Sequence, residues 1–253
     1  ILSLLLSKMV YVWYMKVCAT IPIKSNSARV KNKNFRLLGD KPLYQYIIDH
    51  CIQAECFDDI YVDTDSAEIN SYCVKNQVIC IKRKPELTLD TANGNDVFHY
   101  DIDFVGHYDF YFQLYATAPF LKPKTIRECV DKLTHSSKHD SILTATQEYG
   151  WFWHKEQPVN YQPNILPRSQ DATPVIKETT GLYGISKRAY ERYRCRVGAT
   201  PYFYIIRDRK ECIDLDTQED FKEAESFYAE EDQDEAEEEP EEETPESSET
   251  SEE

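Results

Sequence analysis

Residues 24–34 form a segment that is rich in cations and contains no acidic side chain. It directly follows an apolar run over residues 17–23, which predicts a buried strand ending where the polar segment begins. Its cationic, hydroxyl and amide side chains are Lys24, Ser25, Asn26, Ser27, Arg29, Lys31, Asn32, Lys33 and Asn34. A loop of this composition at the end of a buried strand suits a polyanion such as a nucleoside triphosphate.

Asp214 and Asp216 form a second candidate site near the other end of the chain. The sequence predicts a strand over residues 212–215, and side chains two apart on a strand point to the same face of a sheet. Both carboxylates can then reach one cation, and Mg²⁺ is typically held by one or two carboxylates together with substrate phosphates. Residues 216–219 also fit a helix N-capping pattern, so metal binding and capping both remain open and are compatible.

Residues 147–177 are rich in proline, aromatic and polar residues and are too long for a tight connection. We interpret them as a subdomain arm or a functional excursion. Arg168 and Lys177 lie in this region and can neutralise an acidic substrate, although ordinary surface charge is the alternative. No glycine precedes Gly39, so there is neither a Walker loop nor a dinucleotide fingerprint, and a phosphate site must rely on side chains.

The net charge of −16 belongs to one end of the chain. Residues 230–253 contain 15 acidic residues and no basic ones, which leaves the remaining chain close to neutral. We predict a disordered tail over residues 229–253, since it cannot bury enough apolar surface to offset its ordering entropy; its partner is unknown. The body has no surplus of basic charge, which argues against nucleic acid as the principal ligand.

The eight cysteines include no Cys-x-x-Cys pair and mostly lie in apolar runs, which favours buried reduced thiols in a cytoplasmic protein. Residues 1–14 are apolar but too short to span a bilayer and lack a basic n-region and a cleavage site, so we predict no membrane association. We treat them as an appendage, possibly not native, with an added strand as the alternative. The domain itself is predicted over residues 15–228.

Strand and helix patterns alternate along this domain. Strands are predicted over residues 16–23, 60–62, 78–81, 110–115, 141–146, 181–185, 202–206 and 212–215. Helices are predicted over residues 42–54, 93–106, 125–133, 187–193 and 217–228, with a capping box at residues 65–68 that begins another. This alternation predicts an α/β fold with a mainly parallel, Rossmann-like sheet, flanked by helices and carrying ligand sites at the carboxyl ends of its strands.

Several motifs, in colinear order over residues 16–228, resemble the acylneuraminate cytidylyltransferases, which make CMP-activated nonulosonic or Kdo-type acid sugars. Residues 21–34 are similar to the family's I-P-A-R-x-x-S-x-x-x-P-x-K-N loop, and residues 37–43 to its LLxGKPL segment. Residues 57–66 resemble its second strand and T-D-S turn, and residues 113–119 lie where the family has LLQPTSP. Residues 211–221 resemble its closing ID-x-D-T-x-x-D-F.

The resemblance implies that CMP passes from CTP to the anomeric hydroxyl of an acidic sugar, with Mg²⁺ as cofactor and pyrophosphate as product. It implies catalytic roles for Lys24, Arg29, Lys33 and Asp214, and metal binding by Asp214 and Asp216. The implied nucleotide-binding residues are Ser27, Asn34, Thr64, Asp65 and Thr117. The implied sugar-binding residues are Arg168, Gln170, Lys177 and Thr180. Residues 147–177 match the family's dimerisation arm, which implies a homodimer.

The chain departs from the family pattern at several positions. Lys24 replaces the usual arginine, which keeps the charge but loses the bidentate fork. Ala28 stands at the lysine of the sialic-type Ser-Lys pair, and Tyr115 at the glutamine of LLQPTSP. Two alternatives therefore remain: another nucleotide-sugar nucleotidyltransferase or a glycosyltransferase, and a catalytically inactive scaffold.

Overall fold

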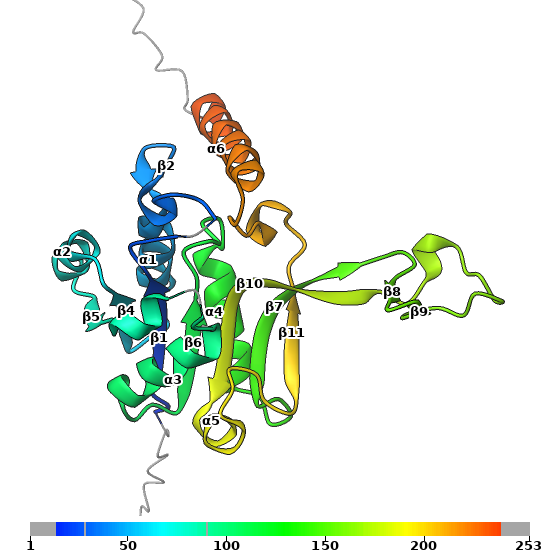
Figure 1. Cartoon of the computed structure of the whole chain (residues 1–253), viewed down its shortest axis with the longest axis horizontal. Helices are drawn as coiled ribbons and strands as arrows, with labels where there is room; N and C mark the ends of the chain where they lie inside the picture. The colour runs from blue at the N-terminus through cyan, green and yellow to red at the C-terminus, as the bar shows by residue number, and fades with distance from the viewer. Residues whose placement is uncertain (1–13, 28, 90, 239–253) are drawn as a thin grey trace, which may run out of the picture.

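The protein is built around a seven-stranded sheet with helices on both faces (Figure 1). The computed structural model describes residues 14–27, 29–89 and 91–238. Residues 1–13 of the predicted appendage and residues 239–253 of the predicted tail therefore lie outside the described residues, as does Ala28.

The sheet has the strand order β11-β7-β10-β6-β1-β4-β5. Its strands are β1 (Val17–Ile23), β4 (Asp59–Thr64), β5 (Ile79–Lys82), β6 (Phe110–Leu114), β7 (Ser141–Glu148), β10 (Val175–Ser186) and β11 (Pro201–Ile205). Strands β5, β4, β1 and β6 run parallel, as do β7 and β11, whereas β10 is antiparallel to both of its neighbours. The predicted mainly parallel sheet is therefore confirmed, with one reversed strand near its middle.

Successive residues of β1 belong to different hydrophobic cores because they point to opposite faces of the sheet. Ala19 and Ile21 pack with residues of helices α1 (Leu43–Ala54), α2 (Ala67–Lys75) and α4 (Pro123–Thr134). Cys18 packs with residues of α3 (Gly94–Val105) and α5 (Lys187–Tyr193). The central strand is thus covered on both faces, and its carboxyl end is where the polar segment can emerge.

The last helix, α6 (Gln218–Glu238), packs through its first turns against the loop region beside β1. Phe221 and Ala224 are fully buried in a third core with Leu38, Leu43 and Leu215, to which the buried Val30 also contributes. Helix α6 extends ten residues beyond the predicted boundary at residue 228, so the first part of the predicted disordered tail is helical.

Two short features of the closing segment differ from the sequence prediction. Residues 212–215 are not a strand: a short 3-10 helix, η4 (Lys210–Cys212), leads into irregular backbone. Asp216 is not the capping residue of α6, because the carboxylate of Asp220 accepts from the backbone N–H groups of Asp216 and Thr217, while the Thr217 hydroxyl accepts from Asp220. Ser66, rather than Asp65, likewise caps α2, through a bond from the backbone N–H of Ile69.

Strands β7 and β10 continue past the sheet and carry an arm made of residues 149–174 (Figure 1). The arm contains a small hairpin of β8 (Trp153–His154) and β9 (Gln157–Pro158), and a single turn, η3 (Ser169–Asp171). The predicted excursion is therefore an extension of two core strands. A register shift between Glu178 and Tyr183 separates the part of β10 inside the sheet from the part that enters the arm.

All eight cysteines are free thiols, as the sequence predicts. Cys18, Cys51, Cys73 and Cys129 are buried in the cores. Within the described ranges, none of the helices combines enough length with enough hydrophobicity to span a bilayer.

Candidate active site

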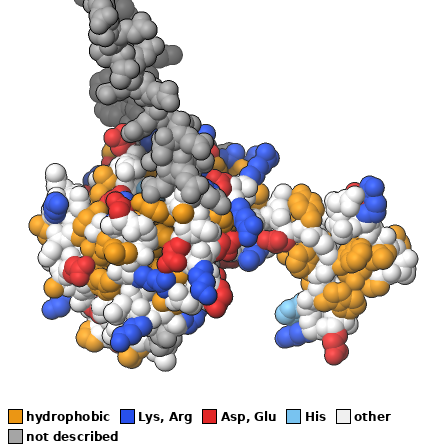
Figure 2. All heavy atoms as spheres, turned by 90° about the horizontal axis from the view of Figure 1, so that it is seen from above, with side chains coloured by type: hydrophobic (Ala, Val, Ile, Leu, Met, Phe, Trp, Pro, Cys, Tyr) orange, Lys and Arg blue, Asp and Glu red, His pale blue; other side chains and the backbone are white. Residues whose placement is uncertain are grey.

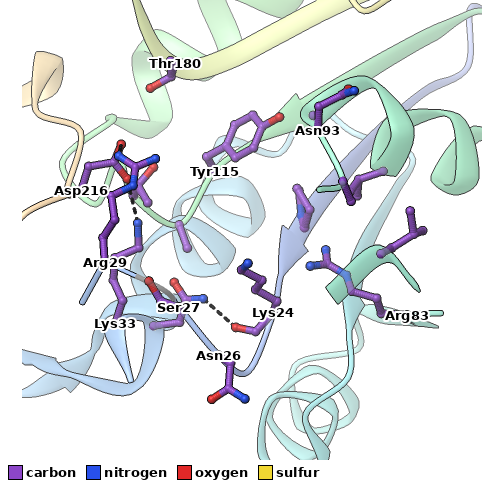
Figure 3. Close-up of a pocket in the computed structure, with 18 of the residues that line it drawn as sticks. Lys24, Asn26, Ser27, Arg29, Lys33, Arg83, Asn93, Tyr115, Thr180 and Asp216 are labelled. Atoms are coloured by element: carbon purple, nitrogen blue, oxygen red, sulfur yellow. Dashed lines mark hydrogen bonds and ion pairs between the residues drawn. The ribbon is translucent and has the colours of Figure 1, made fainter. Parts of the chain in front are cut away.

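A cavity of about 410 Å³ opens at the carboxyl ends of β1 and β6. It is lined by the loop after β1, the turn after β6, the start of α3, and residues of β10 and the segment before α6. Figure 3 shows side chains from these separate segments directed toward one space. The cavity therefore lies where a parallel α/β sheet is expected to bind ligands.

Hydrogen bonds hold the loop after β1 in place, one set to Asp65, which directly follows β4, and one between the two ends of the loop. The backbone N–H and the hydroxyl of Ser25 both donate to the Asp65 carboxylate, at 2.7 and 2.5 Å. Partial burial opposes ionisation of Asp65, but these bonds outweigh it and lower its pKa below the ordinary value. The side-chain amide of Asn34 donates to the Lys24 carbonyl at 2.8 Å. The loop is thus closed on itself before any ligand binds.

Arg29 and Lys33 converge on the carboxylate of Asp216 (Figure 3). Their nitrogens lie 2.5 and 3.0 Å from its two oxygens. Lys33 is nearly buried and Arg29 is largely exposed, with 11% and 69% of their side chains accessible. This carboxylate therefore joins two segments that the sequence analysis treats as separate sites.

Asp214 lines the same cavity and accepts a hydrogen bond from the Thr180 hydroxyl. Thr180 has a φ of 57°, in the left-handed region that residues with a Cβ rarely adopt, and it lies at the register shift of β10. The segment of Asp214 is fixed by a 2.8 Å bond from the backbone N–H of Leu215 to the carbonyl of Thr117. Irregular backbone held by this bond, rather than the predicted strand, therefore carries both carboxylates to the cavity.

The donor set of this site is chemically suited to Mg²⁺. Asp214 and Asp216 supply hard carboxylate oxygens beside a cationic loop, and Mg²⁺ needs only one or two carboxylates when phosphate oxygens and water complete its octahedron. No group of three or more His, Cys, Asp or Glu residues suited to a metal occurs in the described part of the chain. The site is therefore suited to a metal that arrives with a phosphate ligand rather than to a closed protein cage.

Asp63 and Asp101 form a buried acidic pair beneath one wall of the cavity, and Arg83 is bound to Asp63. The sequence analysis missed all three residues. Arg83 lines the cavity and its guanidinium forms a 2.8 Å ion pair with Asp63, both side chains being almost fully buried. Asp101 is completely buried beside them. Burial, reinforced by the charge of Asp63, raises the pKa of Asp101 well above its ordinary value and so favours the protonated form of this carboxyl. Arg83 follows β5 directly, and that position was the signal that could have identified it.

Tyr115 and Arg196 form a second group that the sequence analysis did not place in the site. Both line the cavity, and the Arg196 guanidinium donates to the Tyr115 hydroxyl at 2.6 Å. Arg196 also lies over the ring of Tyr183, 3.7 Å from its centroid. Nothing in the local sequence around Arg196 marks it, because the contact depends on the fold.

The predicted site residues fall into two groups. Those that line the cavity are Lys24, Ser27, Arg29, Lys33, Asn34, Thr117, Thr180, Asp214 and Asp216. Those outside it are Thr64 and Asp65 below the loop, Lys177 at a neighbouring hollow, and Arg168 and Gln170 on the arm. Arg168 is 75% exposed and pairs with Asp171 at 2.5 Å, so in a single copy of the chain it does not reach the cavity.

The comparisons with known proteins agree with this geometry. A sequence model of the family described as cytidylyltransferase matches residues 18–242. The chain belongs to the cytidylyltransferase family. The sequence-based assignment to this family is therefore confirmed, and the match spans both the cationic loop and the two aspartates.

Two relatives of this cytidylyltransferase illustrate the range of the family. CMP-N,N'-diacetyllegionaminic acid synthase of Legionella pneumophila is 36% identical over 82% of this chain and 94% of its own length. N-acylneuraminate cytidylyltransferase of Streptococcus agalactiae is 27% identical over 82% of this chain. The chain spans only about half the length of such N-acylneuraminate cytidylyltransferases, 48% and 52% for two of them.

A solved structure of CMP:2-keto-3-deoxy-manno-octonic acid synthetase complexed with CTP has the same fold. It superposes with a TM-score of 0.62 over 85% of this chain and 99% of the other. At 15% sequence identity this likeness supports the α/β architecture alone.

The buried pair predicts a measurable dependence of stability on pH. The pKa of Asp101 is higher in the folded protein than in the unfolded chain. At a pH between these two pKa values, the folded protein therefore binds one more proton at this carboxyl than the unfolded chain does. The free energy of unfolding consequently falls as pH rises through this range. Asp101→Asn removes this term. We expect wild type to lose stability relative to the variant above about pH 4, with a slope of up to about 1.4 kcal/mol per pH unit. Urea unfolding of both proteins between pH 4 and 8 measures this difference, and a difference that does not vary with pH would contradict it.

Proposed function

We propose that this cytidylyltransferase transfers CMP from CTP to the anomeric hydroxyl of an acidic, nonulosonic-type sugar and releases pyrophosphate. The observation that carries the proposal is the convergence of a cationic loop and two carboxylates on one cavity at the carboxyl ends of the strands. Family membership and the names of the relatives, which include synthases of CMP-sugars, point in the same direction.

In this proposal, the triphosphate binds along residues 24–34. Lys24, Arg29 and Lys33 neutralise its negative charge, and Ser27 and Asn34 supply polar contacts at the same wall. Thr117 lines the cavity beside them. The chemistry asks little covalent work of the protein, so positioning and charge neutralisation account for most of the expected rate enhancement.

The ion pairs of Asp216 suggest how the site changes partners when the nucleotide binds. In the structure, Asp216 neutralises Arg29 and Lys33, so the loop does not present two isolated cations. A triphosphate offers the same cations stronger partners, because phosphate oxygens accept charge-assisted bonds. Asp216 would then be free to hold Mg²⁺ together with Asp214, where the metal would supply neutralisation of phosphate charge and activation of the attacking hydroxyl.

We further propose that the arm packs against a second copy of the chain. It exposes a group of large apolar side chains, 46–68% accessible, at Trp151, Trp153, Ile165 and Leu166. Figure 2 shows hydrophobic side chains gathered on the arm to the right of the body. Such packing would carry Arg168 and Gln170 toward the other copy, where they, with Lys177 and Thr180, would approach the sugar.

The proposed reaction is tested by measuring pyrophosphate release. CTP, UTP, ATP and GTP are each combined with neuraminic, legionaminic, pseudaminic and Kdo-type acids in the presence of Mg²⁺. We expect release only with CTP and an acid sugar. Folded protein that binds CTP but gives no release with any pair would contradict the proposal, and turnover of a preformed nucleotide sugar without pyrophosphate would indicate a glycosyltransferase.

Asp214→Asn tests the proposed metal site. The substitution keeps the shape of the side chain but removes the charge that Mg²⁺ requires, so we expect turnover to fall at least about 100-fold with an unchanged melting temperature. Asp208→Asn, a change at a half-buried carboxylate that pairs with Lys122 outside the cavity, is the control and should retain activity. Near-normal turnover of the Asp214 variant would remove this residue as a metal ligand.

Association through the arm is tested by the double substitution Ile165→Asp and Leu166→Asp. Both side chains are at least 60% exposed in the single chain, so the variant should fold normally. We expect the wild type to sediment as a dimer and the variant as a monomer. Val74→Asp, a similarly exposed apolar position on α2, is the control. A wild type that sediments as a monomer at micromolar concentration would contradict the proposed packing.

A further inference from the structure

Arg196 is a cation of the cavity that no carboxylate neutralises among the described residues. The other guanidinium groups at the cavity are paired: Arg29 with Asp216, and Arg83 with Asp63. Arg196 contacts only neutral groups, namely aromatic rings, a phenol and an amide oxygen. A half-buried guanidinium kept without a counter-ion at a ligand cavity is suited to an anion supplied by the ligand.

The head of Arg196 is held in one orientation. Its guanidinium lies over the Tyr183 ring at 3.7 Å and donates from Nη1 to the Tyr115 hydroxyl at 2.6 Å. The Tyr115 hydroxyl in turn donates to Oε1 of the fully buried Gln113 at 2.6 Å. Both hydrogen bonds of the guanidinium use Nη1 among the described residues, so the N–H groups of Nη2 and Nε can donate to a ligand.

Tyr115 supports Arg196 as a neutral group. Burial outweighs the opposing influence of Arg196 and raises the pKa of the Tyr115 phenol, which keeps its proton for the bond to Gln113. The guanidinium charge is therefore not cancelled by a phenolate.

Arg196 contacts the turn after β6 and the start of α3, whereas the cationic loop follows β1. Figure 3 places Tyr115, its partner, between Thr180 and Asn93, whereas Ser27 and Lys33 lie at the opposite wall. The head of Arg196 rests on Gly94, where a Cβ would come within 2.6 Å of Nη1. The cavity thus carries cations on segments that are distinct in the sequence, as expected for a ligand pair with two anionic groups.

We propose that Arg196, positioned by Tyr115, binds the carboxylate of the acidic sugar. This proposal rests on the proposed function and adds a specificity residue to the same site. A guanidinium is matched to a carboxylate by two parallel N–H bonds, and a neutral sugar would leave that fork unsatisfied in the cavity. Within a single chain, Arg196 lines the cavity whereas the arm residue Arg168 lies outside it, so Arg196 is the cation that the chain itself offers to the carboxylate.

The first test compares wild type with Arg196→Ala, Arg196→Lys and Gly94→Ala. Gly94→Ala keeps the arginine but its methyl group displaces the guanidinium. With the most active acid sugar of the screen, we expect Arg196→Ala to raise the KM for that sugar at least about 10-fold, with smaller increases in the other two variants. The Kd for CTP with Mg²⁺, measured by calorimetry, should change less than about twofold. A large rise in that Kd with an unchanged KM for the sugar would assign Arg196 to the nucleotide and overturn the proposal.

The second test uses the carboxamide of the same sugar, which lacks the negative charge. Calorimetric binding of both sugars in the presence of a non-hydrolysable CTP analogue needs no turnover. Wild type should prefer the acid at least about 10-fold and Arg196→Ala should show little preference. Equal preference in wild type and variant, or loss of preference in Arg168→Ala alone, would overturn the assignment. If the preference for the acid depends on Arg196 but no pyrophosphate is released in the screen, the proposed reaction is wrong and the assignment of Arg196 stands.

Discussion

The carboxylate of Asp216 is the contact on which the geometry of the site depends. It accepts from Lys33 and Arg29, residues 183 and 187 positions away in the sequence. Without this anion, Arg29 and Lys33 would lose the carboxylate that neutralises both of them and joins their loop to the closing segment. The bond from Leu215 to Thr117 and the packing of Phe221 and Ala224 then fix the carboxylate itself. The cavity is therefore assembled by a segment that joins it late in the chain.

Most of the fold could be predicted from the sequence because hydrophobic pattern and element length are local signals. The buried strand β1 and helix α5 are at or within one residue of their predicted positions. The strand over residues 212–215 was predicted wrongly because its short apolar run matches the period of a strand, yet no neighbouring strand remains for it to pair with. The reversed direction of β10 was missed for a similar reason, since pairing direction is a property of the whole sheet.

The site could be predicted where its chemistry lies in consecutive residues, and not where it depends on contacts between distant ones. Lys24, Arg29 and Lys33 share one loop, and Asp214 and Asp216 share another. Arg83 and Arg196 reach the cavity from isolated positions, and Tyr115 contacts Arg196 only because β6 and the segment after α5 come together in the fold. Asp65 illustrates the converse: its family motif marks it, but its carboxylate is occupied in holding Ser25.

Arg29 and Lys33 differ in exposure to solvent, and this difference determines how their ion pairs with Asp216 respond to salt. Salt screens exposed charges over distances of about 8 Å at physiological ionic strength and affects buried pairs much less. The contact of Arg29, which is 69% exposed, weakens as ionic strength rises, whereas that of Lys33, at 11%, persists. Rising ionic strength therefore weakens the outer of the two contacts first and leaves the inner contact between Lys33 and Asp216 in place.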